Sequence, residues 1–244
     1  MPGPQINLAN HSMSLEDFIA KAEHELQPLQ LPKPPLWHVA QDGVAKNRPD
    51  GLWLEFGTGS GTTTRMLCEA RQKKPVYSFD WFQGLPDAWG DRFQKGAFKF
   101  DPPLDLPSNA HIISGLFEES LGPFLKEHPE PADLVHVDCD IYSSTKSVLS
   151  QLSERLVPGT VIVFDELLYY PGRENHEVKA FYEWLCESGA SFEWIGIYGN
   201  EPAESYFAKA DRDPSLALDY FVTAESRVVR FDIPLNERVA VQIV

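Results

Sequence analysis

Acidic residues close most of the short apolar runs in this sequence. The runs "LWLEF", "VYSFD", "LVHVDCD" and "VIVFDE" carry them at Glu55, Asp80, Asp138, Asp140, Asp165 and Glu166. Because such runs are typical of strands, and ligands of parallel sheets bind beyond the carboxyl ends of strands, we expect these carboxylates to gather at one edge. Carboxylates suit hydroxyl groups, an ammonium group or a hard divalent cation, and they oppose a pyrophosphate.

The glycine-rich stretch "GTGSG" follows the first of these runs and lets the backbone pass close to a ligand. The carboxylate that precedes it is expected to favour a cationic group. S-Adenosylmethionine carries an ammonium group, a sulfonium and no phosphate, so these residues favour it over a nucleotide. The donor-binding residues predicted here are Glu55, Gly57, Thr58, Gly59 and Thr62.

The next two strand ends extend the predicted donor site. Asp80 can accept hydrogen bonds from both ribose hydroxyls, although a helix N-cap or a solvated turn is the alternative. Trp81 follows it directly and is expected to pack near the nucleoside. The third strand end is expected near the adenine, with plain packing as the alternative, through Ser114, Gly115, Leu116 and Phe117.

The acids of the last two strand ends predict a metal site. Asp138 and Asp140 are two residues apart, so on a strand both would face one side, and Asp165 is expected on a neighbouring strand. Carboxylates brought together repel one another unless a cation neutralises them, and oxygen ligands favour magnesium, calcium or manganese over zinc. Caps of the following helices are the alternative. His136 is expected to be a hydrogen-bonded core histidine rather than a ligand.

The order of the runs predicts an α/β fold. Strand-like runs alternate with helical stretches along most of the 244 residues, which is typical of a mostly parallel sheet. Before them, Ser14 with Asp17 three positions later marks the start of an amphipathic helix, which the proline-rich stretch "QPLQLPKPPL" ends. We therefore expect an N-terminal helical extension over residues 1–48, packed on one domain over residues 49–244.

Composition limits the partners. The net charge of −15 opposes nucleic acid and anionic membranes, because binding to phosphate depends largely on Lys and Arg. The sequence opens without a basic and apolar leader, and no apolar run approaches the about 18 residues of a membrane span. Three separated cysteines, Cys68, Cys139 and Cys186, are expected to be reduced core thiols. A cytoplasmic protein is predicted, and a homo-oligomer is compatible with the sequence.

Two long irregular segments interrupt the alternation, at about residues 81–108 and 199–230. The first is dense in tryptophan and phenylalanine, which predicts either a small satellite core or a wall that closes over donor and acceptor. Near the last helix, His176 either borders the substrate or is an exposed residue at the helix start.

Several motifs together resemble the class I S-adenosylmethionine-dependent methyltransferases, and more closely the macrocin O-methyltransferase family. They are "EFGTGSGTTT", "FDWFQGLPDAWG", "GLFEESL", "VDCDIYSSTKSVL", "GTVIVFDELL" and "ERVAVQIV", in this order over residues 51–244. The resemblance implies a Rossmann-like sheet of seven strands with helices on both faces and an antiparallel last strand, "RVAVQIV". It also implies magnesium, or another hard divalent cation, beside the methyl donor.

The resemblance assigns roles to the acids. It places the metal on Asp138, Asp165 and Glu166, and Asp138 also beside the donor. Family members have two adjacent aspartates where this sequence has Asp165 and Glu166, so the last ligand departs from the family pattern. It also implies that Asp140 is the general base, with Tyr142 as the competing candidate.

The function expected from these observations is metal-dependent O-methylation of a small hydroxylated acceptor, a vicinal diol such as a sugar of a natural product. Two alternatives remain. One is a methyltransferase-like protein that binds the donor without transfer. The other is a Rossmann NAD(P) oxidoreductase, against which stand Glu55, the G-x-G-x-G spacing and the later acids.

Overall fold

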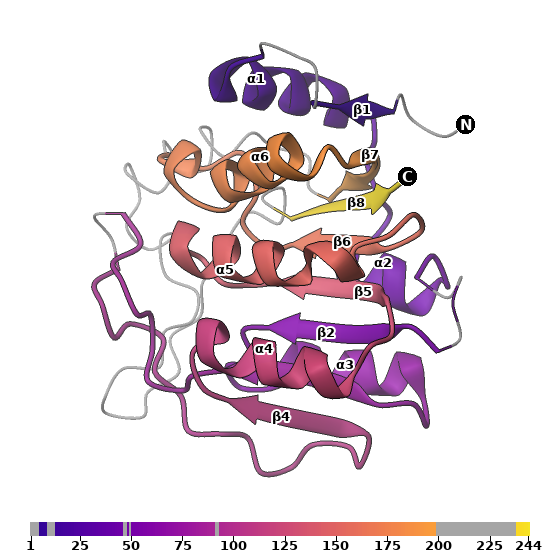
Figure 1. The fold of residues 1–244 in the computed structure, drawn as a ribbon, viewed down its shortest axis with the longest axis vertical. Helices are drawn as coiled ribbons and strands as arrows, with labels where there is room; N and C mark the ends of the chain where they lie inside the picture. Colours follow the sequence, from indigo (N-terminus) through magenta and orange to yellow (C-terminus); the bar gives the residue numbers. More distant parts are fainter. Residues whose placement is uncertain (1–4, 9–12, 46–47, 49, 91–92, 199–237) are drawn as a thin grey trace.

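The protein is an α/β structure built on one mixed sheet (Figure 1). The computed structural model describes residues 5–8, 13–45, 48, 50–90, 93–198 and 238–244. The strands are β1 (Ile6–Asn7), β2 (Leu52–Phe56), β3 (Val76–Asp80), β4 (Ala110–Ser114), β5 (Ala132–Val137), β6 (Val161–Phe164), β7 (Ser191–Ile197) and β8 (Val239–Ile243). The α-helices are α1 (Leu15–Leu26), α2 (Pro35–Gln41), α3 (Thr62–Arg71), α4 (Phe117–Glu127), α5 (Tyr142–Leu152) and α6 (Glu177–Ser188), and the 3-10 turns are η1 (Ser153–Arg155) and η2 (Arg173–Asn175).

The sheet order is β1-β7-β8-β6-β5-β2-β3-β4. Strands β2 to β6 pair in parallel, and β8 lies antiparallel between β6 and β7. The predicted fold class, a mostly parallel Rossmann-like sheet whose last strand is antiparallel, is therefore confirmed. The sequence analysis expected seven strands; the eighth is the two-residue β1, which pairs with the edge of β7 through Ile6 and Phe192.

Alternating side chains of the strands build two apolar layers. Leu54 and Phe56 of β2 belong to the core beneath α4, α5 and α6, whereas Trp53 faces the core shared with α2 and α3. This separation follows from the two-residue period of a strand, whose successive side chains point to opposite faces. Figure 1 shows α4, α5 and α6 on one side of the sheet and α2 with α3 on the other.

The N-terminal helix packs on the far end of the sheet. Ser14 caps it as expected, since its hydroxyl accepts a hydrogen bond from the Asp17 N–H at 3.1 Å. The ring of Phe18, only 1% exposed, packs against Phe181 of α6 and Phe192 of β7, with centroids 6.4 Å away in both cases. The helix is therefore joined to the main core, and the domain division at residue 48 stays a prediction.

The structure agrees with the expectation of buried thiols for two of the three cysteines. Cys68 and Cys139 are buried, but Cys186 on α6 is exposed, so the prediction that it is a core thiol is wrong. It lies in the last turn of α6, where the helix leaves the core.

The predicted irregular segment at 199–230 lies outside the described residues. Among those that are described, no helix has the length and apolar character needed to cross a membrane.

The packing of α1 gives a stability prediction. We expect Phe18→Ala to lower the free energy of unfolding by about 3–5 kcal/mol, because it removes a buried ring from between α6 and β7. Denaturant unfolding measures this loss, and Lys21→Ala on the exposed side of the same helix is the control. If both variants unfold at the same denaturant concentration, α1 does not share the core.

Candidate active site

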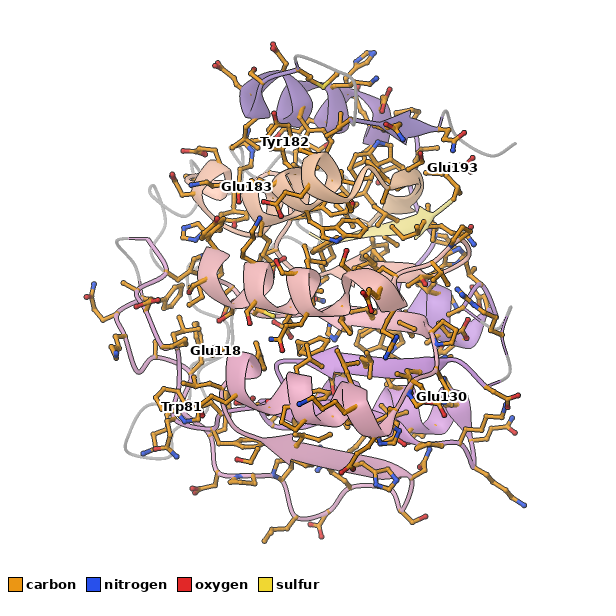
Figure 2. All side chains as sticks on the ribbon, in the orientation of Figure 1. Trp81, Glu118, Glu130, Tyr182, Glu183 and Glu193 are labelled. Atoms are coloured by element: carbon orange, nitrogen blue, oxygen red, sulfur yellow. The ribbon has the colours of Figure 1, made fainter. Side chains whose placement is uncertain are left out.

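A cleft of about 350 Å³ lies at the carboxyl edge of the parallel strands. It collects residues that follow β2, β3, β4, β5 and β6, which is where ligands bind in open α/β sheets. Figure 2 shows two of its lining residues, Trp81 and Glu118, at this edge, with Glu130 at the opposite edge of the sheet. The cleft contains most residues of the predicted donor site, all three predicted metal ligands and the predicted base, Asp140.

The lining confirms the placement of many predicted residues without testing their roles. Those found there are Gly57, Thr58, Gly59, Thr62, Asp80, Trp81, Gly115, Leu116, Phe117, Asp138, Asp140, Asp165 and Glu166. Lining residues that the sequence analysis did not single out include Ser60, Thr63, Leu85, Glu118 and Ser144. Each lies within a motif already quoted, so the motifs themselves are the signal that could have found it.

Asp80 ties the glycine loop to β3. Its Oδ2 accepts hydrogen bonds from the N–H groups of Thr58 at 3.0 Å and Gly59 at 2.9 Å, and its Oδ1 accepts one from Phe82 at 2.6 Å. No helix follows directly, so Asp80 is not a helix cap. Gly57 has a φ of 105°, and a Cβ there would lie 2.0 Å from the carbonyl oxygen of Asp138. The loop therefore needs glycine where it passes the end of β5.

Glu55 lies elsewhere than expected. Its side chain is fully buried, does not line the cleft and accepts hydrogen bonds from Ser78 at 2.6 Å and Thr64 of α3 at 2.5 Å. The cationic group beside Glu55 is a side chain of the protein, His136, whose Nδ1 lies 3.4 Å from Glu55 Oε1. The expectation that Glu55 meets a donor's cationic group is corrected. Ser114 is exposed and also lies outside the cleft lining.

The acids after β5 come together through a turn rather than through strand alternation. β5 ends at Val137, and Asp140 adopts a left-handed backbone with φ 63°, so the expectation that Asp138 and Asp140 share a strand face is wrong. The turn nevertheless brings the acids together. Carboxylate oxygens of Asp138, Asp140 and Glu166 all lie within 4.8 Å of one another.

Asp165 has cationic neighbours on two sides. Arg238, just before β8, places its Nε 2.7 Å from Asp165 Oδ1, and His136 Nε2 lies 3.8 Å from the same oxygen. Burial opposes the ionised form of Asp165, but Arg238 and His136 hold its pKa well below the usual range. Burial would lower the pKa of His136, but Asp165 and Glu55 raise it to about 10. The predicted core histidine is thus a buried cation between two carboxylates.

The pKa values of the other three acids are raised. Burial raises the pKa of Asp138, Asp140 and Glu166, and the negative charge of Asp165 raises each of them further. The pKa of Asp140 reaches about 7. Glu166 is only 5% exposed, and its Oε2 has no hydrogen-bond partner among the described residues. A buried carboxylate oxygen without a partner, beside two more carboxylates, fits a hard divalent cation.

The aromatic segment forms both a cluster and a wall, so neither expectation excludes the other. Trp89 stacks on Phe93 with ring centroids 5.1 Å apart and also lies 6.5 Å from the ring of His176. Trp89, Phe98 and Phe100 also line the cleft. His176 lies at the start of α6 as expected, but it is only 9% exposed, so the prediction that it is an exposed residue is wrong. It does not line the cleft, and its place beside a substrate stays a prediction.

Comparison with known proteins agrees with this geometry. A family profile described as a methyltransferase domain matches residues 54–167, which run from β2 past β6. The match spans the glycine loop and every acid that lines the cleft.

Individual relatives are more distant. The ribosomal protein L11 methyltransferase of Cupriavidus metallidurans is 26% identical over 81% of this chain and 67% of its own. The structure of CalS11, a calicheamicin methyltransferase, is 20% identical over 74% of this chain and 79% of its own, with a TM-score of 0.51. The O-methyltransferase NovP is 15% identical, with coverage of 93% and 96% and a TM-score of 0.42. Together, the profile and the CalS11 likeness show the class I S-adenosylmethionine-dependent methyltransferase fold.

The raised pKa of Asp140 predicts how stability depends on pH without divalent ions. Its folded pKa of about 7 exceeds the unfolded value near 3.8, so between these pH values the folded state binds more protons. Its contribution to stability is therefore present at low pH and lost as the pH rises through about 7. We expect the melting temperature of Asp140→Asn minus that of the unaltered protein to increase from pH 5 to pH 7.5. The reason is that only the unaltered protein loses this contribution as the pH rises. An equal pH dependence in the two proteins would contradict the raised pKa.

Proposed function

We propose that this protein is a metal-dependent O-methyltransferase that transfers a methyl group from S-adenosylmethionine to a hydroxyl group of a small diol. A sugar of a natural product is the acceptor that fits best. The observation that carries the proposal is the set of buried carboxylates beside the glycine loop, in which Glu166 Oε2 has no partner among the described residues. A methyltransferase without a hard cation has no evident use for such a set.

The donor is proposed to bind along the ends of β2, β3 and β4. Asp80 accepts hydrogen bonds from the N–H groups of Thr58 and Gly59 and so fixes the glycine loop where it lines the cleft. A carboxylate at this position can also accept hydrogen bonds from ribose hydroxyls. Trp81, Leu116 and Phe117 supply apolar surface for the nucleoside.

Asp138, Asp165 and Glu166 are the residues proposed to hold the cation. Asp140 lies within the same reach of Asp138 and Glu166 and is the competing third ligand, because Asp165 is already paired with Arg238. When bound, a hard divalent cation lowers the pKa of an acceptor hydroxyl and neutralises the acids around it. The chain's part is to hold oxygen ligands at one wall of the cleft.

Asp140 is proposed as the general base. Its pKa near 7 suits a group that takes a proton at neutral pH, and its side chain lines the cleft. In the proposed step, the acceptor oxygen forms a bond to the methyl carbon, the carbon–sulfur bond breaks, and the hydroxyl proton passes to Asp140. Tyr142 is a poor rival, since its hydroxyl bonds to Glu183 at 2.7 Å and does not line the cleft.

The aromatic wall and the resemblance to the macrocin O-methyltransferase family support a sugar or similar acceptor. Trp89, Phe98 and Phe100 add apolar aromatic surface to a cleft that the acids also line, which suits a ring with one apolar face and neighbouring hydroxyls. The ion pair of Asp165 with Arg238 favours a second candidate, a protein that binds the donor without transfer.

Donor binding can be tested at Asp80. We expect Asp80→Ala to weaken S-adenosylhomocysteine binding by about 10-fold or more, because lost charge-assisted hydrogen bonds cost about 1.5–3 kcal/mol. Calorimetric titration measures the affinity, and Asp101→Ala, an exposed acid of the neighbouring segment, is the control. Unchanged affinity in Asp80→Ala would remove this residue from the donor site.

Metal dependence can be tested by chelation. We expect excess chelator to abolish methyl transfer to diol acceptors and magnesium to restore it, because the acids otherwise repel the ionised acceptor. Transfer of a labelled methyl group is the measurement, and S-adenosylhomocysteine binding in the presence of chelator is the control for folding. Full turnover in excess chelator would refute the metal, and donor binding without any turnover would support the second candidate.

A further arm of this experiment uses Asp140→Asn. The change keeps the side chain's size, so donor and metal affinities should persist while transfer slows by about 10² or more, the usual effect of losing a positioned base. Lost metal affinity would instead make Asp140 a ligand.

A further inference from the structure

Glu177 is a buried acid that the cleft chemistry described above does not use. It begins α6, is fully buried and does not line the cleft. Its Oε1 accepts a hydrogen bond from the N–H of Cys139, and its Oε2 accepts one from the N–H of Glu166, both at 3.3 Å. One carboxylate therefore joins the loop after β5 to the loop after β6.

These two loops carry four of the acids that line the cleft, Asp138, Asp140, Asp165 and Glu166. Cys139 lies between Asp138 and Asp140, and Glu166 follows Asp165 directly. The sheet fixes only the first acid of each loop, because the Asp138 N–H bonds to Phe56 O and the Asp165 N–H bonds to Val137 O, both at 2.9 Å. Beyond these bonds, Glu177 links the two loops directly.

Stability alone does not explain an acid at this position. Burial and the charges of Asp140 and Asp138 oppose the ionised form of Glu177, and no cationic side chain within the described residues forms an ion pair with it. The following residues of α6, Val178, Ala180 and Phe181, are fully buried and apolar. An apolar residue of similar size is often at least as stabilising as a buried charge. A role in arranging the two backbone N–H groups accounts for the carboxylate.

We propose that Glu177 is a positioning residue, which holds the loops after β5 and β6 at the spacing that lets their carboxylates share one hard divalent cation. The inference rests on the proposed function, because it assumes that the acids bind a cation. Glu177 itself stays outside the cleft and acts through the backbone N–H groups of Cys139 and Glu166. Mutation of residues that orient metal ligands typically lowers metal affinity by about 10- to 100-fold.

The test is manganese binding to the full chain after chelator treatment, followed by electron paramagnetic resonance, without donor or acceptor. Glu177→Gln keeps the size of the side chain but sets an amide NH2 against one of the two N–H groups. We expect it to weaken manganese binding by about 10-fold or more. Binding of S-adenosylhomocysteine should stay within about 2-fold, because the hydrogen bonds of Glu177 go to Cys139 and Glu166 and not to the glycine loop, and the loss of one of them is a local change.

Leu185→Ala is the matched control for loss of stability. Leu185 is fully buried two turns further along α6, so its truncation should lower the melting temperature without altering manganese affinity. Unchanged manganese affinity in Glu177→Gln would overturn the inference, as would an equal loss in Leu185→Ala. If the unaltered protein binds no manganese, the proposed metal site fails, and the inference fails with it.

Discussion

Repulsion between buried carboxylates at one edge of the sheet is the constraint on which the rest of the site depends. Asp138, Asp140 and Glu166 share a space in which their oxygens lie within 4.8 Å, and burial makes each negative charge harder to sustain. The fold compensates unevenly, since Arg238 and His136 hold the pKa of Asp165 low but lower that of Asp138 by less than burial and Asp165 raise it. Asp138, Asp140 and Glu166 line the cleft, and their mutual repulsion is the basis of the cation site proposed there.

Glu55, His136 and Asp165 form a buried row of alternating charges between the glycine loop and the acids of the cleft. Glu55 holds the start of α3 through Thr64, faces His136, and His136 in turn faces Asp165. The glycine loop leads directly into α3, so the row links the support of the donor loop to the support of the acids. Substitution of His136, at the centre of the row, would therefore affect both Glu55 and Asp165, since interacting charges in a protein interior respond together.

The fold could be predicted from the sequence because its cues are local. Alternation along β2 separates Leu54 from Trp53, and strand ends are visible as apolar runs that close on an acid. Most cleft residues follow from those ends. Glu55 was misplaced because it comes one residue before the end of β2, on the face that α3 covers.

The remaining failures involve contacts that no spacing reveals. The approach of Asp140 to Glu166 depends on a left-handed turn, which the sequence does not mark with glycine. Glu177 looks like an ordinary acid in the first turn of a helix, where acids are common, and only the path of the chain after β6 carries it beneath the two loops. The pairing of Asp165 with Arg238 joins residues far apart in the sequence.

The position of β8 has a consequence for the order in which the molecule forms. This strand comes after β6 and β7 in the chain but lies between them, so hydrogen bonding from β7 and β1 to the rest of the sheet passes through it. During synthesis on the ribosome, the edges of β6 and β7 that pair with β8 stay unpaired until residues 239–243 emerge. Unpaired strand edges can pair with other chains and aggregate. Arg238 arrives with the same strand, so Asp165 gains its guanidinium partner in the step that closes the sheet.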